Sequence, residues 1–273
     1  MKSLSETEEN EVYHQRFGGV ARLFGKRAQE RIRDAHICVV GLGGVGSWTV
    51  EALARSGVGR MTLIDLDDVC VTNTNRQVHA VEKVYGMNKV AAMKERVRMI
   101  APLAEVTVRP AFLTQQNVNM LLSERFDCVV DAIDSVKNKC EIIAAGRQRG
   151  IPIVTVGGAG GRVDATQIRV ADLAQTIRDP LLKAVRKKLR RHYSAKIPSG
   201  PMFGVNAVYS TESMRYPDGE GEVCDRPVEG QSLKMDCESG YGAACFVTGS
   251  FGFAAAGCAV ELLVNQSKAA PSV

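Results

Sequence analysis

The chain has 273 residues, which is enough for one large α/β domain or two small ones. Its net charge of +5 is only mildly basic and does not by itself establish nucleic-acid binding. None of the eight cysteines forms a C-x-x-C pair, which argues against zinc-finger and thioredoxin-like sites. The first twenty residues lack the basic and apolar segments of a signal peptide, so we expect a cytoplasmic protein.

The first predicted element is a helix. Residues 1–12 are acidic and polar, and we expect a frayed end there. From Arg16 onwards apolar residues recur at helical spacing, which predicts a helix that docks one face against a sheet. These apolar residues are Val20, Leu23, Phe24, Ala28 and Ile32.

An apolar run at residues 37–40 leads directly into a glycine-rich turn. Gly41, Gly43 and Gly46 have the G-x-G-x-x-G spacing, which is typical of a loop whose backbone N–H groups approach a phosphate. The next predicted strand, 60–65, ends in Asp65, about 20 residues after the glycines, where a ribose hydroxyl is held in such folds. Together the two segments predict a nucleotide site and leave the identity of the nucleotide open.

Strand and helix patterns then alternate as far as residue 156. This alternation predicts right-handed crossovers and a mostly parallel sheet with helices on both faces. The predicted strands lie at 105–109, 127–132 and 151–156, and the predicted helices at about 88–100, 117–122 and 139–149. Beyond Gly161 the rhythm changes, and strands at 166–170 and 205–210 predict a mixed extension. The fold class is therefore α/β and Rossmann-like, with a mixed carboxyl-terminal extension.

Several polar residues follow the ends of the predicted strands, so we expect them to meet at the carboxyl edge of the sheet. Carboxylates bind Mg²⁺ together with phosphates, and arginine and lysine neutralise the charge that develops on a leaving pyrophosphate. A redox Rossmann domain needs no such set, which disfavours an NAD-dependent oxidoreductase, although any one of these residues alone could be a solvated loop charge. They are Asp65, Asp67, Asn73, Arg76, Lys89 and Asp134.

Six motifs occur in order between residues 41 and 135. They are Gly-Leu-Gly-Gly-Val-Gly-Ser at 41–47, Leu-Ala-Arg-Ser-Gly-Val-Gly at 53–59, Leu-Ile-Asp-Leu-Asp at 63–67, Thr-Asn-Thr-Asn-Arg-Gln at 72–77, Gly-Met-Asn-Lys at 86–89 and Asp-Ala-Ile-Asp-Ser at 131–135. In these motifs the chain resembles the adenylating enzymes of the ThiF/MoeB/HesA, ubiquitin-activating-enzyme-like superfamily over residues 13–170.

The resemblance implies a pocket for ATP and Mg²⁺, with Asp134 as the metal ligand. It also implies that Arg16 reaches the triphosphate of the neighbouring protomer in a homodimer, and that Arg16, Arg76, Lys89 and Asp134 are catalytic. The residues that match the pocket are Gly41, Gly43, Gly44, Gly46, Asp65, Asp67, Asn73, Arg76, Lys89 and Asp134.

Six further segments are similar to the tRNA threonylcarbamoyladenosine dehydratase branch of this superfamily, namely 16–23, 155–161, 172–174, 179–181, 208–212 and 235–240. This similarity extends over nearly the whole chain and implies one adenylating unit over residues 1–273. Within it, 13–170 would be the nucleotide-binding core, and 171–273 a substrate-side extension with a C-terminal helix.

That branch uses ATP to close the threonylcarbamoyl side chain beside the tRNA anticodon into a ring. An acyl-adenylate fits the residues, because the attacking carbamoyl group belongs to the substrate and no catalytic cysteine is required. One alternative is an adenylating enzyme for a ubiquitin-like sulfur carrier, although we expect no ubiquitin-like partner. Another is a sulfur-relay partner of a cysteine desulfurase and a sulfur-acceptor protein, with Cys237 as a reactive thiol.

A basic helix is predicted at about residues 180–193, with a cationic face that is either solvated or in contact with RNA phosphates. For an anticodon stem-loop substrate we favour RNA contact, with the region around Lys137, Lys139, Arg147 and Arg149 as the alternative surface. The predicted contacts are Arg186, Lys187, Lys188, Arg190 and Arg191.

Residues 239–260 carry no charge, and their length would allow a membrane span. Their many glycines and hydroxyl groups favour a loop followed by a buried helix, with peripheral or single-pass membrane association through 239–264 as the alternative. Cys38, Cys128 and Cys258 lie in apolar runs and are predicted to be core residues.

Overall fold

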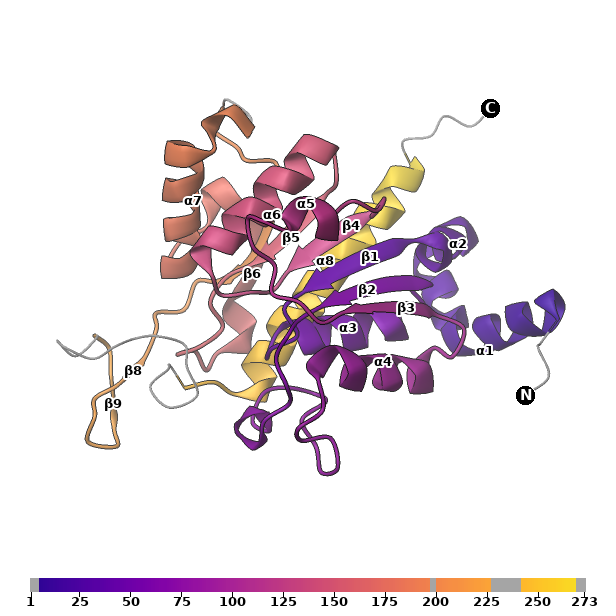
Figure 1. The fold of residues 1–273 in the computed structure, drawn as a ribbon, viewed down its shortest axis with the longest axis horizontal. Coiled ribbons are helices and arrows are strands. Elements are labelled where there is room, and N and C mark those ends of the chain that lie inside the picture. Colours follow the sequence, from indigo (N-terminus) through magenta and orange to yellow (C-terminus); the bar gives the residue numbers. More distant parts are fainter. Residues whose placement is uncertain (1–4, 197–199, 227–241, 269–273) are drawn as a thin grey trace.

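The computed structural model describes residues 5–196, 200–226 and 242–268, and within these ranges seven strands form one sheet in the order β3-β2-β1-β4-β5-β7-β6 (Figure 1). All neighbouring strands are parallel except β6 and β7, which pair antiparallel at one edge. The strands are β1 (His36–Val40), β2 (Arg60–Ile64), β3 (Glu105–Arg109), β4 (Cys128–Asp131), β5 (Ile153–Val156), β6 (Ile168–Asp172) and β7 (Asn206–Ser210).

The strand order reverses at β1, which has β2 on one side and β4 on the other. The chain runs outward from β1 through β2 to β3 and then returns to place β4 beside β1. Such a reversal leaves a crevice beyond the carboxyl ends of the two central strands, where open α/β sheets bind ligands.

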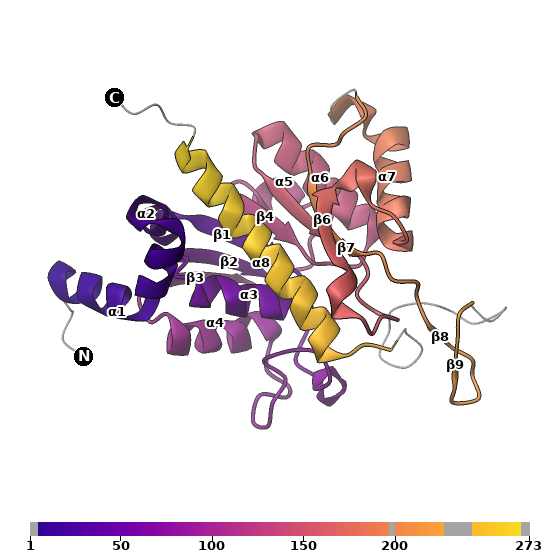
Figure 2. The ribbon, with the colours of Figure 1, turned by 180° about the vertical axis from the view of Figure 1, so that it is seen from behind.

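Helices cover both faces of the sheet (Figures 1 and 2). Residues of β1 alternate between two cores, because Ile37 and Val39 pack with α3, α4 and α8, while Cys38 and Val40 pack with α5, α6 and α7. The helices are α2 (Lys26–Asp34), α3 (Gly46–Arg55), α4 (Lys89–Ile100), α5 (Val118–Leu121), α6 (Val136–Arg149), α7 (Pro180–His192) and α8 (Cys245–Lys268).

The amino-terminal segment differs from its prediction. Residues 5–12 are ordered in α1 (Glu6–Phe24), which begins with a reciprocal cap: the Ser5 hydroxyl accepts from the Glu8 N–H and the Glu8 carboxylate accepts from the Ser5 N–H. The predicted single helix is also wrong, because Gly25 adopts a positive φ of 93° and separates α1 from α2.

This break changes which apolar residues are buried. Ala28 and Ile32 of α2 join the core as predicted, whereas Leu23 is 74% exposed and Phe24 38% exposed at the end of α1. The helical spacing therefore identified the docking face of the second helix, whereas of the residues predicted to dock from the first helix only Val20 packs against the core.

Figure 2, which views the molecule from behind, shows the long apolar helix α8 lying across the sheet. It packs against α2, α3 and strands β4 to β7. Its stretch Cys245–Asn265 is long and apolar enough to span a membrane, but 67% of that window is buried inside the protein. The predicted buried helix is thus confirmed. Cys38, Cys128 and Cys258 are buried as expected.

The remaining elements are short. A small antiparallel hairpin, β8 (Tyr216–Pro217) with β9 (Val223–Cys224), follows β7. Single 3₁₀ turns occur at Val71–Asn73, Ala165–Gln167, Leu173–Gln175 and Ser194–Lys196. Cys237 lies outside the described residues.

Candidate functional site

A cavity of about 730 Å³ opens at the carboxyl ends of β1, β2, β4 and β5. Nearly every residue that the sequence assigned to the nucleotide site lines it, although these residues come from five separate loops and helix starts. They are Gly41, Gly43, Gly44, Asp65, Asp67, Asn73, Arg76, Lys89 and Asp134. The predicted convergence of polar groups at this edge is therefore present in the structure.

The glycine turn between β1 and α3 is set by close backbone packing. Gly41 has a φ of +87°, and a Cβ there would lie 2.8 Å from the side chain of Ile133. Gly46 does not line the cavity, and a Cβ on it would lie 1.8 Å from the Gly41 carbonyl oxygen, so it serves helix–strand packing. By contrast, a Cβ on Gly43 would meet none of the described atoms within 4 Å, so the backbone is open to a ligand there.

Asp65 is a buried carboxylate at the end of β2. Its two oxygens accept hydrogen bonds from the backbone N–H groups of Leu42, at 2.6 Å, and Asp67, at 2.9 Å. Burial raises the pKa of Asp65, and the opposing effects are the charge of Lys89 and these two hydrogen bonds. Asp65 thus ties the glycine turn to the end of β2.

Lys89 is the first residue of α4, whose N-cap is Asn88. Its ammonium group lies 2.8 Å from a carboxylate oxygen of Asp67, and its side chain is only 8% exposed, against 50% for Asp67. The cation is therefore held at the cavity wall by a partner that is itself half in water.

Asn73 and Arg76 lie in the loop after β2. The Asn73 side-chain oxygen accepts from the Cys70 N–H at 3.0 Å, and the Arg76 guanidinium donates to the Thr72 carbonyl and to Asn75, both at 2.9 Å. The Arg76 carbonyl in turn accepts from the Trp48 indole at 2.9 Å and from the Thr248 hydroxyl at 3.4 Å. Thr248, on α8, also lines the cavity and was missed because it is 172 residues away in the chain.

Asp134 is an exposed carboxylate in the cavity lining, just before α6. Among the described residues no group of three or more His, Cys, Asp or Glu side chains could hold a metal ion. The Mg²⁺ of a nucleotide needs no such group, because it is usually bound through one or two carboxylates and the phosphates themselves. Since Asp67 is paired with Lys89, Asp134 is the carboxylate that fits this role.

Beneath the cavity lies a buried ionic group that sequence reasoning missed. Lys139 and Asp131 are both fully buried, with 3.1 Å between the ammonium nitrogen and a carboxylate oxygen. Thr155 on β5 completes the group by donating its hydroxyl to Asp131 at 2.7 Å. Lys139 therefore holds α6 to the ends of β4 and β5. The prediction that Lys139 belongs to the alternative RNA-binding surface is wrong, because its side chain has no contact with solvent.

A second buried charge organises the loop after β5. The Arg162 guanidinium donates to the carbonyls of Gly158, Arg178, Ser210 and Glu212, at 2.5 to 3.1 Å, and lies 3.8 Å from Asp179. Asp179 accepts from the Gly158 N–H and caps α7 at Leu182. This network orders the Gly157–Gly160 segment, which lines the cavity. The glycines of this loop and Asp179 lie in segments that the resemblance had singled out, whereas Arg162 had no recognisable signal.

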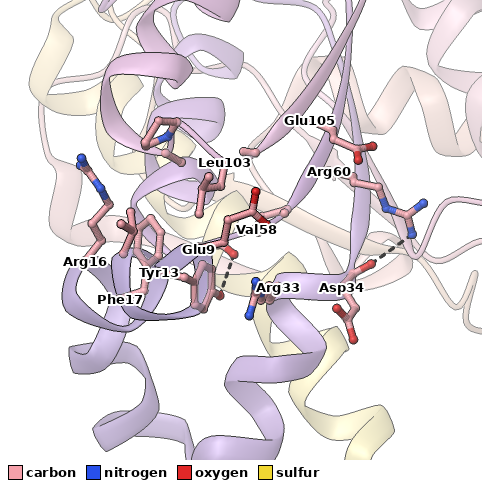
Figure 3. A pocket seen from close by; sticks show the side chains of 16 residues that line it. Glu9, Tyr13, Arg16, Phe17, Arg33, Asp34, Val58, Arg60, Leu103 and Glu105 are labelled. Atoms are coloured by element: carbon pink, nitrogen blue, oxygen red, sulfur yellow. Dashed lines mark hydrogen bonds between the residues drawn. The ribbon is translucent and has the colours of Figure 1, made fainter. Parts of the chain in front are cut away.

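Arg16 lies at the opposite edge of the sheet (Figure 3). Its guanidinium donates to the Ile100 carbonyl at 3.2 Å, and it lines a second cavity of about 470 Å³ near the amino ends of β2 and β3. It does not line the large cavity of its own chain. An action of Arg16 on a nucleotide therefore requires the cavity of another protomer.

The basic helix α7 has its apolar residues Leu182, Val185 and Leu189 buried, as the spacing predicted. Lys183, Lys187, Arg190 and Arg191 are exposed, and Lys188 is half-buried. Arg186 differs, because it donates to the Thr176 hydroxyl and burial lowers the pKa of its guanidinium. Arg186 is thus engaged within the protein and is the weakest of the predicted RNA contacts.

A nucleotide-type cavity at the switch point of a parallel sheet, lined by glycine backbone and paired charges, is the arrangement of an adenylating α/β enzyme. The model of the ThiF family matches residues 18–263, and the chain belongs to that family.

Within the family, the chain is 50% identical over 259 residues to the tRNA threonylcarbamoyladenosine dehydratase of Escherichia coli (strain K12), covering 94% of this chain and 97% of that protein. The solved structure of TcdA (CsdL) matches with a TM-score of 0.86 and 46% identity, over 98% of this chain and 99% of that one. The E. coli enzyme in complex with ATP matches with a TM-score of 0.84 and 44% identity, over the same shares of the two chains.

Proposed function

We propose that this chain is an ATP-dependent tRNA threonylcarbamoyladenosine dehydratase. The observation that carries the proposal is the single cavity in which Asp65, Arg76, Lys89 and Asp134 meet the glycine turn, in a chain that matches dehydratases of this kind along nearly its whole length.

The reaction runs in two steps in this proposal. A carboxylate oxygen of the threonyl group attacks the α-phosphorus of ATP, and pyrophosphate leaves. The carbamoyl oxygen of the same side chain then attacks the acyl carbon, AMP leaves with the former carboxylate oxygen, and a carbamoyl N–H gives up its proton to solvent. The net change is the loss of one water from the modified nucleoside, and no nucleophile from the protein is needed because the attack is intramolecular.

The protein's contribution is to position the reactants and stabilise charge. Asp65, at the end of β2, is placed to accept from a ribose hydroxyl, and the glycine turn offers backbone N–H groups to the phosphates. Arg76 and Lys89 stabilise the negative charge that grows on the pyrophosphate. The exposed ring of Phe112 lines the same cavity and is suited to stack on an adenine.

Mg²⁺ bound by Asp134 and the phosphates would neutralise phosphate charge and orient the leaving group. Asp134 fits this role because it is an exposed cavity carboxylate without a neighbouring cation partner among the described salt bridges.

Four further assignments complete the proposal. The active form is a cytoplasmic homodimer in which Arg16 acts in the partner's cavity, which the distant position of Arg16 in its own chain supports. The exposed cations of α7 contact the anticodon stem-loop. Residues 1–273 form one unit, with 13–170 as the nucleotide-binding core and 171–273 as the substrate-side extension. Any link to a cysteine desulfurase and a sulfur acceptor would depend on Cys237.

The alternative is an adenylating enzyme for a ubiquitin-like sulfur carrier, since the same cavity chemistry would serve it. The two are distinguished by the acyl substrate that drives exchange of pyrophosphate with ATP. A protein ending in Gly-Gly would do so in the alternative, and threonylcarbamoylated tRNA in the proposal.

The decisive experiment incubates bulk tRNA with ATP, Mg²⁺ and the protein, and then analyses the nucleosides by mass spectrometry. We expect threonylcarbamoyladenosine to lose the mass of one water, with formation of AMP and pyrophosphate. An unchanged nucleoside, despite confirmed ATP binding, would contradict the proposed function.

A further inference from the structure

The large cavity extends over more strand ends than the nucleotide uses. Its lining comes from the ends of β2, β1, β4 and β5, which are consecutive in the sheet. Neighbouring strands lie about 4.8 Å apart, so the row of four ends measures roughly 14 Å. The ribose partner Asp65 follows β2 and the phosphate-binding glycines follow β1. Apart from Asp134, which the proposed function assigns to Mg²⁺, the lining that follows β4 and β5 is therefore left for another group.

The lining at this second end has a different chemistry. It consists of small residues, half-buried polar residues and the aliphatic side chains of Ile133 and Leu181, and among its described members only Asp134 is charged. The cations that bind phosphates, Arg76 and Lys89, come from the loops after β2. This second end thus suits an acyl group that lies next to the α-phosphate, and it does not repeat a phosphate site.

The Gly157–Gly160 segment at this end is held from behind by buried charges. Arg162 and Asp179 fix the backbone of Gly158 through its carbonyl and its N–H. A Cβ on Gly157 would lie 2.0 Å from Asp179, so Gly157 faces the network. A Cβ on Gly158 would meet none of the described atoms within 4 Å, so Gly158 faces open space in the cavity lining.

We propose that Gly158 and its loop, with Asn138 of α6 and Leu181 of α7, form the subsite for the carboxylate-bearing side chain of the modified adenosine. The inference rests on the proposed function and adds the place where the acyl substrate is held. The Asn138 side chain, half-buried in the cavity lining, supplies a neutral amide for the carbamoyl or carboxylate oxygens. The buried network keeps the loop rigid while the substrate side chain closes into a ring.

The test uses two glycines that are equally open and lie at opposite ends of the cavity. Gly158→Val fills the proposed acyl subsite, and Gly43→Val fills the nucleotide end as the matched control. For Gly158→Val we expect the Kd for ATP to stay within about twofold of wild type. We expect its kcat/KM for a threonylcarbamoylated anticodon stem-loop to fall at least about a hundredfold, because the reacting carboxylate is displaced. Gly43→Val should lose ATP binding.

A second readout separates the subsite from general RNA binding. Wild type should bind the threonylcarbamoylated stem-loop more tightly than the same RNA with plain adenosine, and Gly158→Val should bind the two equally. Gly158→Ala should give an intermediate rate. If Gly158→Val does not fold, Asn138→Ala serves instead, with an unchanged Kd for ATP and a lowered kcat/KM.

Wild-type turnover by Gly158→Val, or by Asn138→Ala in its place, overturns the subsite and leaves the proposed function intact. Loss of ATP affinity in folded Gly158→Val also overturns it, because the residue then belongs to the nucleotide end. A wild-type protein that binds ATP but does not dehydrate the modified RNA overturns the proposed function, and the subsite with it.

Discussion

The charged residues of the cavity lining and those of the layer beneath it are of the same types but differ in their access to the cavity. Arg76, Lys89 and Asp134 border the cavity, with at least one side accessible to a ligand. Lys139 and Arg162 are fully buried and have protein partners. The first group is placed for chemistry, and the second fixes the segments after β4 and β5 that form the other side of the cavity. Lys89 and Lys139 are both buried and both paired with an aspartate, and they differ in that only Lys89 lines the cavity.

The largest effect should come from breaking the buried layer. Arg162→Met removes the donor to four carbonyls and leaves Asp179 buried without its cation, so the free energy of unfolding should fall by about 3–5 kcal/mol. Urea unfolding of the variant measures this loss. The exposed Arg169→Met is the control and should change stability by less than about 0.5 kcal/mol. A loss no larger than that of the control would remove the structural role of Arg162.

Substitution in the cavity lining should affect turnover and leave the fold intact. Arg76→Ala and Lys89→Ala should each lower kcat at least about a hundredfold, because each removes a preorganised cation from the leaving pyrophosphate. Steady-state release of pyrophosphate measures the rate, and the thermal midpoint should stay near that of wild type. The control on the same helix is Arg98→Ala, whose partner is the exposed Glu95. Near-normal rates in folded Arg76 and Lys89 variants would contradict ATP activation at this site.

His79 is a buried side chain that has no anionic partner among the described residues, and burial favours its neutral imidazole. Burial lowers its pKa from 6.5 to about 4, with the nearby charges of Lys89 and Arg96 acting in the same direction. In the unfolded chain the imidazole takes up a proton near pH 6.5, so its contribution to stability is complete above that pH and is lost as the pH falls. This loss amounts to about 2 kcal/mol at pH 5.

The measurement is the unfolding free energy between pH 7 and pH 5. His79→Gln should have a shallower dependence on pH than wild type, whereas His192→Gln, on the exposed side of α7, should keep the wild-type dependence. Equal slopes for the His79 variant and wild type would show that this imidazole does not contribute.

Arg16 tests whether the cavity lining is completed by a second chain. Arg16→Ala and Asp134→Ala should each be inactive alone, while a 1:1 mixture that exchanges subunits should regain about a quarter of the wild-type rate. Half of the dimers are then mixed, and each mixed dimer carries one intact site of two. No recovery after demonstrated subunit exchange would show that Arg16 does not act in the partner's cavity.

The smallest effect concerns a single surface cation. Lys187→Ala should reduce the slope of log affinity for tRNA against log salt concentration by about one, because one phosphate contact is lost. Lys26→Ala, an exposed cation of α2, should leave the slope unchanged. Identical slopes for the two variants would show that Lys187 of α7 is only solvated and makes no phosphate contact.

The charged residues that line the cavity could be predicted from the sequence. The strands and the residues after them were identified because both depend on local patterns: apolar runs of four or five residues, glycine spacings and polar loop starts. Asp65, Lys89 and Asp134 needed only the rule that parallel strands end at one edge.

The buried charged residues beneath the cavity could not be predicted in the same way. Lys139 and Arg162 stand in sequence contexts that normally indicate solvated side chains, and their partners Thr155 and Glu212 are 16 and 50 residues away. The break between α1 and α2 was missed for a related reason, since a glycine inside a helical pattern is compatible with either one helix or two.

The packing of α8 has a consequence for the order in which the protein can mature on the ribosome. This helix comes last among the described elements, yet Thr248 contacts Arg76 and the backbone at Gly252 lies against Trp48 of α3. The first strands are synthesised long before this covering helix, so their back face stays open to water until α8 has been made. A chain cut short before residue 245 would expose that apolar face and lack part of the cavity wall. The cavity wall is therefore complete only after α8 has been synthesised, and tight ATP binding should be confined to chains that extend through this helix.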